Sequence, residues 1–176
     1  MRYAALLRGV NLGRRRVGMA DLRRVLEGEG MESVATYLQS GNAVFETGRQ
    51  GRDKVKQRIE SVIATEFGFD VPVVLVTGDD LAAVIDACPY RKEADADPTK
   101  VHVTFVEPMP PAAQIADLDL EAVAPEHFTV DSGVIYMHLP NGMGRAALPD
   151  LLAKKLAKVT ATTRNWRTVL ALSKML

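Results

Sequence analysis

The chain has 176 residues, of which 47% are hydrophobic and 25% are charged, a composition typical of a soluble globular protein of one or two domains. No apolar run approaches the ~20 residues that a membrane-spanning helix requires, and the first residues lack the cleavage site of a signal peptide. The single cysteine, Cys88, excludes an internal disulfide, so we predict a cytoplasmic protein without membrane contact.

The formal net charge is zero, but the charges are unevenly distributed along the chain. Residues 1–76 carry 12 Lys/Arg against 9 Asp/Glu, residues 77–131 carry 3 against 12, and residues 132–176 carry 7 against 1. If the two basic ends meet in space, they form a positive patch. Alternatively, the basic ends are paired with the acidic middle segment and no such patch exists. The sequence leaves both interpretations open.

The first 76 residues follow the order strand–helix–strand–strand–helix–strand. Short apolar runs predict strands over residues 3–7, 34–39, 42–46 and 71–76. Apolar residues at helical spacing predict one helix from Met19 to Leu26 and another from Val55 to Phe67. A Ser40-Gly41 turn joins the two middle strands.

A third helix follows, capped by Asp79 or Asp80 and ended by Pro89, and residues 90–98 are predicted to form an exposed acidic linker. The strand and helix order then repeats. Strands are predicted over residues 101–106, 127–130, 134–139 and 160–163, with helices within 110–123, over 148–159 and at the C-terminus. A turn over residues 131–133 joins the middle pair of these strands.

This order predicts an α+β protein made of two tandem ferredoxin-like (βαββαβ) units, with extra helices after each unit. We expect a first ferredoxin-like unit over residues 1–78, a helix and acidic linker over 79–98, and a second ferredoxin-like unit with the C-terminal helix over 99–176.

A right-handed crossover makes the first two strands parallel, so their ends share one edge of the sheet. That geometry brings residues 8–13 beside residues 39–42, and gathers Arg8, Asn11, Ser40 and Asn42 at the mouth of the first helix. Backbone N–H groups, a glycine-rich loop and an arginine favour an anion site. The alternative is a purely structural polar cluster, in which the glycines permit turns and the asparagine bonds to its own chain.

Two further basic features accompany this cluster. Arg14, Arg15 and Arg16 lie on the approach to the first helix and form a candidate basic patch. Near the C-terminus, Asn165 is suited to cap the last helix, which leaves Arg164 as a candidate phosphate ligand.

Three stretches have distinctive patterns: LLRGVNLG at residues 6–13, YLQSGN at 37–42 and TRNWRT at 163–168. They resemble the bacterial family catalogued as domain of unknown function 1697. The positions that match its motifs are Arg8, Gly9, Asn11, Ser40, Gly41, Asn42, Arg164 and Asn165. The resemblance implies an α+β fold with two ferredoxin-like units and implies no activity. Residues 78–125 match none of its motifs.

Other chemistry receives little support. Cys88 lies on an apolar helix face and is interpreted as a small buried hydrophobe. The three histidines do not show the spacing of metal ligands, and no cofactor motif is present, so we predict neither metal nor cofactor.

We therefore predict a binding module for an anionic ligand, either nucleic acid or a phosphate-bearing small molecule. The predicted ligand-binding residues are Arg8, Asn11, Ser40, Gly41, Asn42, Arg164 and Asn165. An enzyme that positions a substrate with Ser40 or Asn42 is an alternative, although no general base accompanies them. A structural or interaction protein that pairs through a free sheet edge is a second alternative. Neither a reaction nor an oligomeric state follows from the sequence.

Overall fold

The computed structural model of the protein describes residues 1–111, 113–116, 118, 120–131 and 133–176. Two compact units divide the chain: Met1–Leu81 together with Leu172–Leu176, and Ala82–Ala171. Among the described residues, no helix combines the length and the apolar character needed to cross a bilayer.

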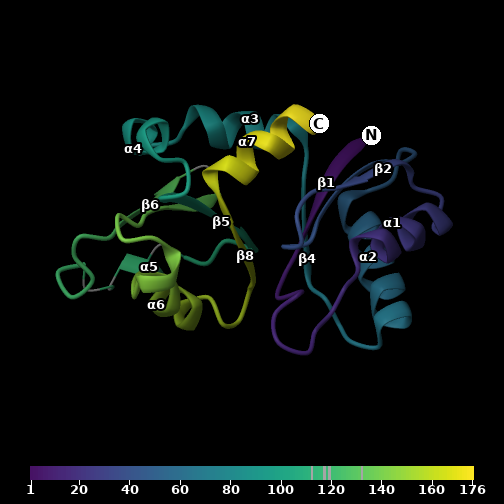
Figure 1. Cartoon of the computed structure of the whole chain (residues 1–176), viewed down its shortest axis with the longest axis horizontal. Helices are drawn as coiled ribbons and strands as arrows, with labels where there is room; N and C mark the ends of the chain where they lie inside the picture. The colour runs from purple at the N-terminus through teal and green to yellow at the C-terminus, as the bar shows by residue number, and fades with distance from the viewer. Residues whose placement is uncertain (112, 117, 119, 132) are drawn as a thin grey trace. The chain divides into compact units, whose positions relative to one another are not determined.

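The described part of the chain is an α+β structure with seven α-helices and two four-stranded antiparallel sheets (Figure 1). The elements of the first sheet and its helices are β1 (Arg2–Leu7), α1 (Met19–Gly28), β2 (Glu32–Thr36), β3 (Asn42–Glu46), α2 (Arg52–Phe67) and β4 (Val73–Val76). Two helices follow, α3 (Gly78–Asp86) and α4 (Arg91–Ala96). The remaining elements are β5 (Val101–Glu107), α5 (Ala113–Ala116), β6 (His127–Asp131), β7 (Val134–His138), a 3-10 turn (Met143–Arg145), α6 (Leu148–Lys155), β8 (Thr160–Asn165) and α7 (Trp166–Met175).

The two sheets share one strand order. The first is β2-β3-β1-β4 and the second is β6-β7-β5-β8, and every neighbouring pair is antiparallel. Because β1 and β2 are both antiparallel to β3, they run in the same direction, as the crossover rule predicts. The ends of β1 and β2 therefore lie at the same edge of the first sheet.

The core of the first unit lies between its sheet and two helices. The helices α1 and α2 cover one sheet face (Figure 1), where Leu22, Leu26 and Ile59 pack against Tyr3 and Phe45. The residues of β1 that point to the opposite face are buried as well, which confirms the prediction from its continuous apolar run.

The second unit is held together by a few specific anchors. The Tyr136 hydroxyl donates to the Val84 carbonyl oxygen at 2.8 Å and so ties β7 to α3. Asn165 caps α7 as predicted, because its Oδ1 accepts from the Thr168 backbone N–H at 2.9 Å. Trp166, the first residue of α7, is only 1% exposed.

Three local expectations differ from the structure. The strand β2 ends at Thr36, since Leu38 has a left-handed backbone (φ +58°), so a five-residue connection replaces the Ser40-Gly41 turn. The segment expected as an exposed acidic linker contains α4, with Ala94 buried. The cap of α3 is Thr77, whose hydroxyl accepts from Asp80 N–H while the Asp80 carboxylate accepts from Thr77 N–H. Ser132, in the predicted turn of the second unit, lies outside the described residues.

His102 on β5 is a buried titratable group without full hydrogen bonding. Its side chain is 6% exposed, and its Nδ1 atom has no hydrogen-bond partner among the described residues. Burial lowers the pKa of His102 from its ordinary value, because the charged imidazolium would lose its hydration.

We expect His102 to make the fold sensitive to mild acid. The lowered pKa in the folded state means that the unfolded chain takes up the proton first, so stability is present above about pH 6.5 and falls as the pH drops further. For each pH unit between the pKa of the unfolded chain and the pKa of the folded protein, the free energy of unfolding falls by up to about 1.4 kcal/mol. Urea unfolding of wild type and His102→Leu at pH 7.5 and pH 5 measures this loss, which His102→Leu should reduce.

An equal loss of stability in wild type and His102→Leu would show that His102 is not the responsible group.

Candidate functional site

The two loops that the topology brings together are joined through Asn11. We call residues 8–18 the first loop and residues 37–41 the second loop. The Asn11 Nδ2 donates to the Gln39 carbonyl oxygen at 2.7 Å and to the Val17 carbonyl oxygen at 3.0 Å, and its Oδ1 accepts from the Val17 N–H at 3.0 Å. This confirms that the two loops are neighbours. The side-chain amide of Asn11 thus closes the first loop on itself and fixes it to the second.

Asn42 performs a similar task in the second loop. Its side chain is fully buried, and its Nδ2 donates to the Tyr37 carbonyl oxygen at 2.8 Å and to the Ser40 hydroxyl at 3.1 Å. The Asn42 carbonyl oxygen accepts from the Tyr37 N–H at 2.9 Å. These bonds close the second loop at its base, at the point where β3 begins.

Gly41 allows this second loop to lie directly against the first. Its φ is +78°, and its carbonyl oxygen accepts from the Leu7 N–H at 2.9 Å. A Cβ at this position would stand 2.5 Å from Val10 Cγ2 and 2.9 Å from Leu7 Cβ. Glycine is therefore required here both by the backbone conformation and by the close approach of the two loops.

The mouth of α1 is less favourable to an anion than the sequence predicts. Arg8 is half-buried, and its backbone N–H donates to the Pro72 carbonyl oxygen at 2.9 Å. However, Gly18 provides no side-chain cap, and the Asp21 carboxylate folds back over it, with Oδ2 2.7 Å from where a Gly18 Cβ would stand. This negative charge at the start of α1 takes the position that a bound anion would use.

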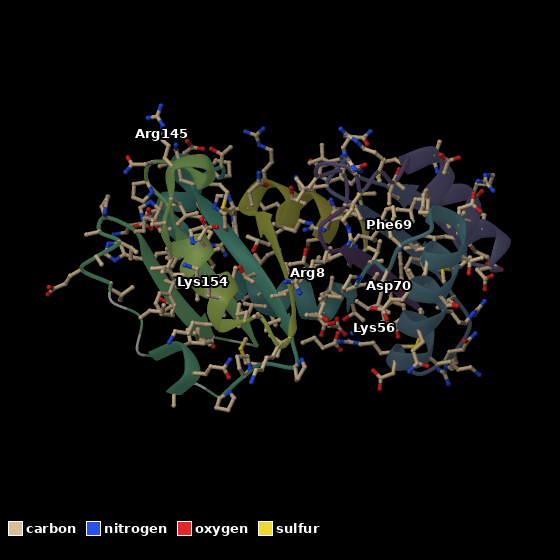
Figure 2. All side chains as sticks on the ribbon, turned by 90° about the horizontal axis from the view of Figure 1, so that it is seen from below. Arg8, Lys56, Phe69, Asp70, Arg145 and Lys154 are labelled. Carbon is tan, nitrogen blue, oxygen red and sulfur yellow. The ribbon has the colours of Figure 1, made fainter. Side chains whose placement is uncertain are left out.

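The three consecutive arginines of the first loop have different environments. The guanidinium of Arg15 lies over the Phe69 ring at 4.9 Å from its centroid and donates to the Asp70 carbonyl oxygen; Phe69 and Asp70 are labelled in Figure 2. Arg14 and Arg16 are exposed, and their side chains have no hydrogen bond or ion pair with any described residue. Arg15 therefore fixes the loop, while its two neighbours remain available to solvent.

Arg164 and Asn165 lie on β8 of the second unit. The Nη1 of Arg164 donates to the Thr162 hydroxyl at 2.7 Å and to the Thr163 carbonyl oxygen at 2.9 Å. Its side chain is buried, and burial lowers the pKa of Arg164 to about 10. The Asn165 oxygen is used as the cap of α7. Their assignment to a ligand stays a prediction.

Other candidates for chemistry are few. Cys88 is buried, as predicted, and burial raises the pKa of its thiol. No group of three His, Cys, Asp or Glu in the described part of the chain is placed to hold a metal ion. A shallow groove of about 470 Å³ runs along α2, and none of the predicted site residues lines it. Its lining residues are Glu29, Lys54, Gln57, Arg58, Ser61, Val62 and Thr65.

We expect Gly41→Ala to destabilise the first unit strongly. A left-handed alanine costs about 1–2 kcal/mol, and the clash with Val10 and Leu7 adds about 1–3 kcal/mol because both neighbours are buried. The free energy of unfolding in urea measures the sum.

Gly68 separates these two contributions. It has nearly the same φ, +77°, but a Cβ there would meet no atom within 4 Å. Gly68→Ala should therefore show the conformational cost alone. Equal losses in the two variants would mean that the two loops are not held in close contact.

Comparison with known proteins agrees with this description of the fold. The solved structure of "conserved bacterial protein SP0830" from Streptococcus pneumoniae matches with a TM-score of 0.76 and 23% sequence identity. The match covers 99% of this chain and 97% of that one, and at this identity it establishes the fold alone. A search of curated proteins found no match.

The model of one protein family matches residues 1–136, which include the first loop, the second loop and all four strands of the first sheet. The family is described as "Protein of unknown function (DUF1697)". The match spans more than half of the chain and confirms the resemblance found in its sequence motifs. The chain belongs to this family of unknown function, DUF1697.

Proposed function

We propose that the first unit is a binding module for an anionic, phosphate-bearing ligand, with nucleic acid as the favoured class, and that Arg14 and Arg16 make the contact. The observation that carries the proposal is their environment. Both guanidinium groups are exposed on a loop whose backbone is fixed, and neither has an acidic partner within the described residues. An unpaired guanidinium is a strong, bidentate donor to phosphate.

The rigidity of the first loop supports this proposal. Besides the Asn11 side chain, the Asn11 N–H donates to the Arg15 carbonyl oxygen at 2.7 Å, and the Arg15 N–H donates to Leu12 at 3.2 Å. Arg15 itself packs against Phe69. A loop that is ordered before binding loses less conformational entropy when it contacts a ligand, so the same phosphate contacts yield more affinity.

In this proposal Asn11, Ser40, Gly41 and Asn42 shape the site and Arg8 lies at its margin, so they support the ligand contact and do not supply it. The Asn11 amide already serves three hydrogen bonds, and Asn42 is fully buried. The enzyme alternative gains no support from these residues, because Ser40 and Asn42 bond to each other. The interaction alternative rests on a different part of the chain and is considered below.

We also propose that both units are ferredoxin-like, because each has the βαββαβ order and the antiparallel strand order that places the first and third strands in the centre. The boundaries at residues 78 and 98 stay part of that proposal. A cytoplasmic, bacterial setting is proposed from the single cysteine and the family resemblance.

We expect the double variant Arg14→Ser/Arg16→Ser to lose affinity for single-stranded nucleic acid. Two phosphate contacts on a single strand contribute about 1.4 to the slope of log K against log salt concentration, so the slope should fall by about that amount. Fluorescence anisotropy of a labelled oligonucleotide at several salt concentrations measures both quantities.

A matched control removes the same charge from the other end of the first sheet. Arg49→Ser/Lys54→Ser lies beyond the end of β3 and at the start of α2, on exposed positions. This variant should keep the wild-type slope. Equal losses of affinity in the two double variants would mean that binding depends on net charge and not on the first loop. If the wild-type protein does not bind nucleic acid, that ligand class is excluded. Inorganic phosphate and nucleotides would then be tested by calorimetry.

A further inference from the structure

The second sheet ends in an edge strand, β6, that is exposed at both ends and half-buried at Phe128 and Thr129. The strand β6 is last in the strand order (Figure 1) and pairs with β7 over all five residues without a bulge. His127 and Asp131 at its ends are exposed, and Val130 is 39% exposed. A regular, exposed edge presents backbone N–H and C=O groups that can pair with another strand.

The other three edge strands, β2, β4 and β8, are either interrupted by a bulge or buried or half-buried. In β2 the pairing register shifts between Glu32 and Ala35, and Ser33 has a left-handed backbone (φ +53°), so the edge is interrupted by a bulge. The strands β4 and β8 are buried or half-buried along their whole length. Among the described strands, β6 is therefore the open edge.

The pairing of β6 with β7 determines which of its backbone groups face outward. Asp131 pairs with Val134, with two residues between them in the sequence. The closing pair of such a hairpin is hydrogen-bonded, and hydrogen-bonded pairs alternate along an antiparallel ladder. The outward N–H and C=O groups are therefore those of Phe128 and Val130.

We propose that β6 pairs in antiparallel fashion with β6 of a second copy of this chain, centred on Thr129, and forms a twofold dimer with a continuous eight-stranded sheet. In this register the outward groups of Phe128 meet those of Val130 in the second copy. Thr129 faces Thr129, and His127 faces Asp131. The contact is isologous, so each unlike pair occurs twice.

The sequence HFTVD is complementary to itself in this register. Apolar Phe–Val pairs stabilise antiparallel strands, and an imidazole N–H can donate to a carboxylate in either protonation state of the ring. The Thr129 hydroxyl already bonds to the Tyr90 hydroxyl at 3.0 Å, so the central Thr–Thr pair contributes by packing. The two neighbouring registers with the same backbone phase are centred on Phe128 and Val130. They place His127 or Asp131 opposite Thr129 and lose the pairing of imidazole with carboxylate.

The test is the oligomeric state of the full chain, measured by sedimentation velocity over a range of concentrations. A ladder of five residues is a small interface, so we expect a weak dimer whose population rises with concentration. Val130→Pro removes one outward N–H at a position where an edge strand tolerates proline, and should weaken dimerisation at least tenfold. Val130→Ala, which keeps the N–H group, is the matched control and should lose less than tenfold.

Charge exchange tests the register itself. His127→Asp places two carboxylates opposite each other and Asp131→His places two imidazoles together, so each single variant should weaken the dimer. The double variant restores both unlike pairs and should recover it, even if Val130→Pro fails to fold as judged by circular dichroism. Wild type that stays monomeric up to about 1 mM would overturn the proposal. A dimer unaffected by Val130→Pro in a folded protein, or no recovery in the double variant, would overturn it as well.

Discussion

The carboxamide of Asn11 is the interaction on which the first unit's loop region depends. One side chain satisfies backbone groups of Val17 and Gln39, which belong to two loops separated by β2 and α1 in the sequence. Buried or half-buried backbone groups need such partners, because leaving them unpaired costs about 1–3 kcal/mol each. With Asn11 in place, the arginines that follow it are presented on a fixed backbone.

Asn11 also has a left-handed backbone conformation, with φ +58°, which places its side chain where it can bond to both loops. Asparagine tolerates this region better than other residues that have a side chain, and its amide offers a donor and an acceptor at the same time. Aspartate would lack the donor and glycine would lack the amide. A single residue type therefore meets both the backbone and the hydrogen-bonding requirement at this position.

The sequence predicts the topology well because strand and helix periodicities are strong and the crossover rule is nearly general. It correctly brings residues 8–13 beside residues 39–42. It fails where the determining contact is distant or small: β2 ends early because Asn42 and Asn11 capture the carbonyl groups of Tyr37 and Gln39. The helix α4 is hidden by its polar composition, since only Ala94 is buried in it. The packing of Arg15 on Phe69 joins residues that no short-range pattern connects.

Three of the motif residues predicted as ligand contacts, Asn11, Gly41 and Asn42, hold the two loops in the structure. Gly41 and Asn42 are buried, and Asn11 is fully engaged in hydrogen bonds. In the proposed function, the exposed side chains of Arg14 and Arg16 in the first loop make the contact with a ligand. A distinctive motif can therefore mark the support of a site more clearly than its contact groups.

The bulge in β2 bears on how far copies of this chain would associate in the proposed dimer. A molecule with two regular open edges would add further copies at both ends, and its sheets would extend into a fibre. The register shift at Ser33 removes one of those ends, while β6 keeps the other. In the proposed dimer, pairing through β6 would use the open edge of both partners. The bulge in β2 and the burial of β4 and β8 would then limit assembly to two copies.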